Sequence, residues 1–259
     1  MIKKSRFVLA LGLTLALGLG AYAFGDAASD ATEFVDGAVN PTNAAGAQPT
    51  KVVKLDKSKA KPVALYTGVR TQAPVTGTQA NPIAENISFG KNVVIDTNAV
   101  PQCTTIAASG STPDQAKASC PKDSYLGSGT ASLAGPGGSS IKDVVVTAFA
   151  GTLPGTTGKN GVLLHTYSPT LQTAAPTVQG FIVNSTAGSK YKFALNVPNA
   201  PETGALMIDS FGSNISKASK TVLATCKSKT FLWLRATTYK DGSKATSTQT
   251  QPCKAKPKH

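Results

Sequence analysis

The sequence has very few residues suited to acid–base or metal chemistry, beginning with only two histidines in 259 residues. His259 is the last residue, and His165 lies inside the run Val-Leu-Leu-His-Thr-Tyr. A histidine in such an apolar run is typical of a packed strand, so we do not expect it to be the base of a catalytic triad. The nucleophile motif Gly-x-Ser-x-Gly is missing. The four cysteines include no Cys-x-x-Cys pair, so we expect no metal site.

Carboxylates are scarce as well, with 13 Asp and Glu against 26 Lys and Arg. A glycosidase needs two carboxyl groups roughly 5 to 9 Å apart. Asp96 and Asp209 each follow or end a strand-like run and form the best available pair, but aspartate at such a position usually belongs to a turn. We therefore expect no enzyme activity, no catalytic residue and no cofactor. The alternative is a secreted hydrolase on a jelly-roll frame that uses Asp96, Asp209 or His165.

Aromatic residues make up only 6% of the chain, which leaves few platforms for stacking nucleic-acid bases. The formal net charge is nevertheless +13. From residue 62 onward the arginines are Arg70 and Arg235 alone, and lysine is poorer than arginine at bidentate phosphate recognition. We therefore expect no nucleic-acid partner. The basic excess predicts either a solubilising lysine coat or an electrostatic hold on an anionic cell-wall or extracellular polymer.

The first 23 residues have the pattern of a secretory signal peptide. Lys3, Lys4 and Arg6 precede an apolar run over residues 7–23, which ends in an Ala-x-Ala site. The alternative is an uncleaved membrane anchor formed by residues 7–23, although this run is at the lower edge of what spans a bilayer. Either way the sequence predicts that the chain works outside the cytoplasm, secreted or held at the cell surface, with membrane contact only through this segment.

The four cysteines fit an exported protein, where an even number usually forms disulfides. The pairs Cys103–Cys120 and Cys226–Cys253 are favoured because each is local. Asp241-Gly242 separates the strand-like runs 231–239 and 244–250, which is a strong hairpin signal. Folding the chain at that turn brings Cys253 opposite Thr230 and so near Cys226.

The chain divides into four predicted segments: the signal peptide over 1–23, a linker over 24–61, a folded domain over 62–253 and a basic tail over 254–259. The linker has an acidic first half and a lysine-rich second half with little to bury, which predicts disorder. A first edge strand within 51–55 is the alternative there, because Val52, Val53 and Leu55 could pack.

From residue 62 onward, apolar and polar residues alternate with the period of two that is typical of half-buried strands. Strand-like runs occupy residues 63–70, 87–96, 124–133, 141–150, 161–167, 177–184, 191–197, 205–211, 220–226, 231–239 and 244–250. Two of them, 141–150 and 161–167, are continuously apolar, as expected of strands packed on both faces. The one helix we predict covers 113–119. Short turns between many strands favour an all-β fold, namely an antiparallel β-sandwich or jelly-roll-like single domain.

The chain also carries a distinctive run around its second cysteine, Cys-Pro-x-x-Ser-x-x-Gly-x-Gly over residues 120–129. A valine-rich run ending in Phe149-Ala150-Gly151 follows, and Cys226 and Cys253 come last. In this order the sequence resembles a group of uncharacterised secreted proteins of soil actinobacteria. The resemblance implies export, an all-β domain and paired cysteines, and it supplies no catalytic residues. We thus expect a non-catalytic β-domain with a structural, adhesive or binding role at the cell envelope.

Overall fold

The computed structural model describes residues 32–41, 52–72, 82–104, 111–134, 139–153, 156, 160–199 and 207–256, with the side chains at 72 and 207–209 excepted. The predicted signal peptide over 1–23 and the last three residues of the predicted tail lie outside this range. Within it, no helix has both the length and the apolar character needed to cross a membrane.

Strands dominate the described residues. They are β1 (Thr32–Val39), β2 (Val53–Leu55), β3 (Lys61–Pro62), β4 (Leu65–Gln72), β5 (Pro82–Gly90), β6 (Val93–Ile95), β7 (Tyr125–Ala134), β8 (Ser140–Ala150), β9 (Gly161–Ser168), β10 (Thr173–Ala174), β11 (Val178–Asn184), β12 (Tyr191–Val197), β13 (Met207–Ile215), β14 (Val222–Ala224), β15 (Thr230–Tyr239) and β16 (Lys244–Ala255). One α-helix, α1 (Pro113–Ser119), and short 3-10 turns at Thr97–Ala99, Lys122–Ser124 and Lys217–Ser219 complete the elements in this part of the chain.

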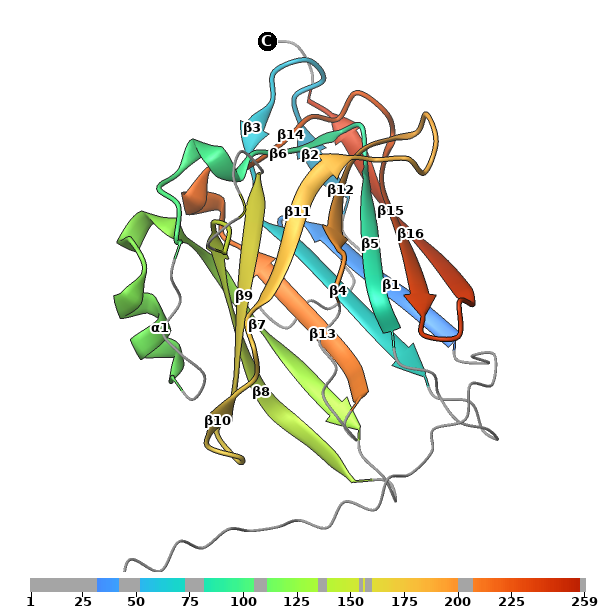
Figure 1. The fold of residues 1–259 in the computed structure, drawn as a ribbon. Coiled ribbons are helices and arrows are strands. Elements are labelled where there is room, and N and C mark those ends of the chain that lie inside the picture. Colours follow the sequence, from blue (N-terminus) through green and yellow to red (C-terminus); the bar gives the residue numbers. More distant parts are fainter. Residues whose placement is uncertain are drawn as a thin grey trace, which may run out of the picture.

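Thirteen strands form one continuous sheet that curls into a nearly closed, barrel-like shape (Figure 1). The order is β1-β4-β13-β7-β8-β9-β11-β12-β5-β15-β16-β2, with β10 paired to β9. Every pairing is antiparallel except that of β16 with β2. The predicted all-β class is confirmed. The predicted sandwich or jelly roll is not, because the strands follow one another around a single sheet instead of dividing into two stacked ones.

The seam of the barrel-like sheet lies between its first strand, β1, and β16. Two glutamines on β16 bridge it by presenting their amide groups to the backbone of β1. The Gln251 side chain accepts from the Val39 amide at 2.8 Å and donates to the Val39 carbonyl at 3.3 Å. The Gln249 side chain accepts from the Gly37 amide. These side-chain hydrogen bonds take the place of a backbone ladder between the two strands. They pair some of the backbone amide and carbonyl groups that the edge strand β1 would otherwise leave unpaired.

The strand β1 corrects the prediction of a disordered linker over 24–61. It pairs with β4 along its whole length and buries Val35, Ala38 and Val39. The acidic residues that suggested a solvated segment do not prevent this packing, because Glu33 lies on the same buried face as Val35 and Val39 while Asp36 lies on the other face. The alternative of an edge strand near 51–55 is confirmed by β2, which lies parallel to the end of β16.

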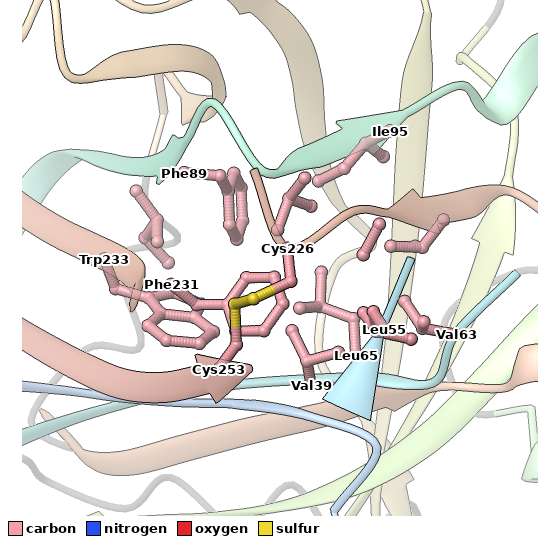
Figure 2. Close-up of a cluster of buried hydrophobic side chains, with 14 of the residues drawn as sticks. Val39, Leu55, Val63, Leu65, Phe89, Ile95, Cys226, Phe231, Trp233 and Cys253 are labelled. Carbon is pink, nitrogen blue, oxygen red and sulfur yellow. A yellow bond between two sulfur atoms is a disulfide. The ribbon is translucent and has the colours of Figure 1, made fainter. Parts of the chain in front are cut away.

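A second, three-stranded sheet (β3-β14-β6) lies over one end of the barrel-like sheet. Its buried residues Val222 and Ile95, together with Val63 just after β3, belong to the same core cluster as Phe89 and Trp233 of the larger sheet. Figure 2 shows Val63, Ile95, Phe89 and Trp233 gathered around the Cys226–Cys253 disulfide. The cluster therefore ties the two sheets into one hydrophobic core.

Both predicted disulfides are present, Cys103–Cys120 and Cys226–Cys253. The hairpin at Asp241-Gly242 is confirmed too, with Gly242 in the left-handed region at φ 82°. The register differs from the expectation by one residue, since Thr230 lies opposite Pro252 instead of Cys253.

The strands β8 and β9 are buried on both faces, as their apolar runs predicted. Val146 and Leu164 face the interior, while Phe149 and Leu163 pack outward against the segment that carries α1 and the Cys103–Cys120 disulfide. The helix begins at its predicted residue because Thr112 and Gln115 form a capping box.

The Cys-Pro-x-x-Ser-x-x-Gly-x-Gly run has a structural explanation in this fold. Ser124 donates to the Pro121 carbonyl at 2.6 Å and fixes the turn that leads into β7. A Cβ at Gly127 would lie 1.8 Å from the Asn214 carbonyl oxygen, and one at Gly129 would lie 1.7 Å from that of Gly212. Both glycines are needed because β7 approaches β13 too closely for a side chain.

Candidate functional site

Three connections meet at one end of the barrel-like sheet, on its outer side. They are the turn between β5 and β6, the loop between β11 and β12, and the loop between β14 and β15. Gly90 lies opposite Tyr191 in the sheet, and the Lys91 amide donates to the Lys190 carbonyl at 3.2 Å. The antiparallel register thus brings together residues that are about 100 positions apart in the chain.

The connections enclose an open groove of about 840 Å³, within the size range of ligand-binding clefts. Its lining consists of Gly90, Lys91, Asn92, Ser189, Lys190, Lys192, Lys227, Ser228, Thr230 and Leu232. Four of these residues are lysines, all exposed, and none is acidic. We call this site the lysine groove and define it by Lys91, Lys190, Lys192 and Lys227.

A buried asparagine holds the walls of the lysine groove in place. The Asn92 side-chain amide donates to the carbonyls of Ser228 and Thr230 at 3.1 and 3.0 Å, and its oxygen accepts from the Ser228 amide at 3.2 Å. The Thr225 amide donates to the Asn92 carbonyl at 2.9 Å. The Cys226–Cys253 disulfide anchors the same loop, between β14 and β15, so Lys227 extends from a fixed backbone.

The charge of the lysine groove is not neutralised by the described part of the chain. Among all described residues, the ion pairs involve Lys117 or Arg235, and none includes a lysine of the groove. The Lys192 ammonium lies 4.9 Å from the centre of the Phe193 ring, which limits its freedom. Four ammonium groups around one open groove create a positive potential suited to a ligand that carries several negative charges.

Comparison with protein families, curated proteins and solved structures found no match. The function of the lysine groove is therefore inferred from its own geometry and charge.

The residues weighed as catalytic candidates lie elsewhere. Asp96 caps a 3-10 turn by accepting from the Asn98 amide at 3.0 Å, which is the turn chemistry expected of it. Asp209 is in β13, and its side chain lies outside the described residues. His165 is 1% exposed on the outer side of β9, with its Nε2 atom 3.0 Å from the Ser111 carbonyl oxygen and 3.1 Å from the Ser111 hydroxyl. Burial lowers the pKa of His165, and its position is that of a packed residue.

The structure also contains a buried ionic group that the sequence did not reveal, formed by Glu33, Glu85 and Arg235. We call it the charge cluster. Arg235 is 2% exposed and forms ion pairs with both glutamates, one of them through its Nε atom at 2.9 Å from Glu85. Thr71 donates to Glu33 at 2.9 Å, and Thr237 donates to Glu85 at 3.3 Å. The cluster lies toward the end of the barrel-like sheet opposite the lysine groove.

Two carboxylates compete for one guanidinium in this cluster, and both are withdrawn from water. Burial raises the pKa of Glu33 to about 7. Burial and the nearby Glu33 carboxylate raise the pKa of Glu85 to about 8. The folded chain therefore retains protons on this pair at pH values where an exposed glutamate is ionised.

Raising the pH from 5 to 8.5 is expected to lower the free energy of unfolding by on the order of 6 kcal/mol through this pair. Both carboxyl groups bind protons more tightly in the folded than in the unfolded chain. Their contribution is complete below the ordinary glutamate pKa of 4.5 and is lost as the pH rises through 7 and 8.

Urea unfolding of the wild type and of Glu85→Gln between pH 5 and 8.5 measures the Glu85 part of this contribution as a difference in slope. The comparison also removes the opposite effect of His165, whose lowered pKa adds stability as the pH rises toward 6.5. A variant with the same pH dependence as the wild type would show that Glu85 holds no extra proton in the folded chain.

One signal in the sequence could have located the charge cluster. Arg235 falls in the alternating run of β15, at the same parity as Phe231 and Trp233. A face that buries an aromatic residue at every second position also buries the arginine among them, and a buried arginine requires carboxylate partners. The identity of those partners depended on the pairing of β5 with β15, which places Glu85 beside Arg235, and on the position of β1, which carries Glu33. The sequence revealed neither.

Proposed function

We propose that the protein is an exported, non-catalytic β-domain that binds an anionic cell-wall or extracellular polymer through the lysine groove. The observation that carries this proposal is the concentration of four exposed lysines, with no acidic residue, around one open groove of about 840 Å³. Two disulfides are compatible with an extracellular protein.

The type of basic residue favours a polymer over a single small anion. Lysine is a hydrated point charge on a flexible stem, and it makes less specific contacts than the planar guanidinium of arginine. Four such charges, three on separate connections and the fourth, Lys192, on β12, suit a chain with repeated negative groups that can engage several lysines at once. Binding of this kind weakens steeply with salt because exposed charges are screened beyond about 10 Å at 0.1 M.

Charge reversal at Lys190 and Lys227 is expected to weaken binding to an anionic polymer at least tenfold at low salt. Each substitution of lysine by glutamate removes a positive charge from the groove and adds a negative one. The two together therefore lower the net charge of the groove by four. The probe is poly(glycerol phosphate), with poly-glutamate as a second anion and dextran as a neutral polymer. Binding is measured by biolayer interferometry at 25, 100 and 300 mM NaCl, with dextran expected not to bind.

The matched control is Lys142→Glu with Lys244→Glu. Both lysines are exposed and lie outside the groove, and the pair changes the net charge by the same amount. We expect the control to reduce affinity by less than threefold. Equal losses in the two double variants would mean that overall charge, not the groove, attracts the polymer. Binding that does not change with salt would exclude an electrostatic mechanism.

A further inference from the structure

The interior of the barrel-like sheet contains a cavity that the proposed function does not use. Its volume is about 80 Å³, and a second cavity of about 50 Å³ shares five of its walls, namely Val69, Ile87, Leu164, Leu195 and Phe211. Together they approach the size of an engineered apolar cavity of roughly 150 Å³ that admits benzene. The walls come from strands on all sides of the interior, so the space lies inside the curled sheet and is partly open to solvent.

One side of the larger cavity is polar. Thr71, Glu85 and Arg235 line it, and the last two belong to the charge cluster. The space is thus amphipathic, with aliphatic walls and a charged side. This is the usual composition of a small-molecule site, in which a few polar groups orient a largely apolar ligand.

The hydrogen-bonding capacity left in the charge cluster belongs to acceptors. Arg235 directs its donors to both carboxylates, to the Thr71 hydroxyl and to the Arg70 carbonyl at 3.1 Å. The Oε1 atom of Glu33 is buried without a hydrogen-bond partner among the described residues, but Glu33 does not line the cavity. Within the cavity wall, the Oε1 atom of Glu85 accepts one hydrogen bond, from Arg235, and a carboxylate oxygen can accept a second. A ligand in the cavity that completes this cluster must therefore donate hydrogen bonds.

The charge of the cluster also favours a ligand that donates hydrogen bonds and is positively charged, because two carboxylates face one guanidinium. The neighbouring cation Arg70 does not correct this, because its exposed side chain lies outside the sheet, 4.2 Å from the centre of the Phe34 ring. A buried carboxylate without a cationic partner is costly. In the free protein a retained proton compensates, as the raised pKa of Glu85 indicates.

We propose that this interior cavity binds a slender aliphatic amine, whose chain lies along the aliphatic walls and whose ammonium group donates to Glu85. An ammonium group has three donors and no acceptor, which matches the unused acceptors. It also brings the second positive charge that balances the two carboxylates. A fatty acid would place a third carboxylate beside Glu85, and an alcohol would supply one donor but no charge.

The test compares butylamine, 1-butanol and butyrate, which have the same chain length and about the size of benzene, by isothermal titration calorimetry at pH 7. We expect butylamine to bind at least tenfold more tightly than either of the others. Its binding should release protons from the carboxyl pair, so the measured heat should vary with the ionisation enthalpy of the buffer. Equal affinities within threefold, or no binding of butylamine, would overturn the proposal.

The variant Glu85→Gln keeps the shape of the cavity and removes the charge. We expect it to bind butylamine at least tenfold more weakly and to keep the butanol affinity of the wild type. The matched control is Asp123→Asn, which removes an exposed carboxylate outside the cavity and should leave the preference for amine intact. The head-group comparison on the wild-type chain decides the question even if Glu85→Gln does not fold.

The cavity and the lysine groove can be tested separately. The double variant Lys190→Glu with Lys227→Glu should bind butylamine as the wild type does, because neither residue lines the cavity. A loss of butylamine binding in that variant would indicate adsorption at the groove and would contradict an interior site.

Discussion

Replacement of Arg235 by methionine is expected to lower the free energy of unfolding by about 3–5 kcal/mol at pH 8. Methionine fills a similar volume and preserves apolar packing, but it leaves Glu33 and Glu85 in the interior without their cation. The Arg70 carbonyl and the Thr71 hydroxyl lose a donor at the same time. Urea unfolding followed by far-UV circular dichroism measures the change.

The difference between the stability loss at pH 5 and at pH 8 distinguishes the loss of charge pairing from a simple packing defect. Because the pKa values of both glutamates are already raised, protonation at pH 5 neutralises them and should reduce the cost of the substitution. A defect in packing would be the same at pH 5 and at pH 8. The variant Arg70→Met is the matched control, since Arg70 is exposed, and it should cost less than about 1 kcal/mol.

A triple variant, Glu33→Gln, Glu85→Gln and Arg235→Met, should recover much of the lost stability. Replacing every member of a buried ionic group with neutral residues of similar size is often neutral or stabilising, whereas removing one member is not. If the triple variant were less stable than Arg235→Met alone, the cluster would contribute through hydrogen bonds and shape, not through charge balance.

The second large effect is expected from removal of the Cys226–Cys253 disulfide. The double variant Cys226→Ala with Cys253→Ala should lose about 2–5 kcal/mol of unfolding free energy. Both cysteines are buried in the core cluster that contains Phe231 and Trp233, and the disulfide ties the loop before β15 to the end of β16 (Figure 2). Thermal and urea unfolding under non-reducing conditions measure this loss.

The other disulfide provides the comparison. The separations of 27 and 17 residues differ so little that chain entropy alone predicts a difference of about 0.4 kcal/mol between the two disulfides. Cys103–Cys120 holds the segment of α1 on the outer face of β8 and β9, away from the main core. We expect its removal to cost clearly less. A larger loss from the outer disulfide would mean that α1 and its loop are central to stability.

Several elements could be read from the sequence because local signals determine them. The strand β15 followed from alternating apolar residues, and the hairpin to β16 followed from Asp241-Gly242. The helix α1 was the one helix predicted, over 113–119, and it has those bounds. Even the disulfide pairs were accessible, because in each case a short loop or a hairpin joins the two cysteines.

Other elements were misread because their signals are not local. β1 was taken for part of a linker because its charged residues hid its alternation, and its pairing partner β4 lies about 30 residues away. The run 87–96 was read as one strand, yet the chain turns at Lys91 and Asn92 and divides it into β5 and β6. That turn is stabilised by Asn92, whose hydrogen-bond partners lie about 136 residues further along the chain.

The sequence by itself determined the all-β class, the position of most strands, the disulfide pairs and the basic character of the chain. These properties depend on periodicity, turn residues and composition, which act over a few residues. Only the tertiary structure decided that the strands curl into one nearly closed sheet, that four lysines meet in one groove, and that Glu33 and Glu85 reach Arg235. Those contacts join residues 100 to 200 positions apart, and strand register, which no single segment encodes, brings them together.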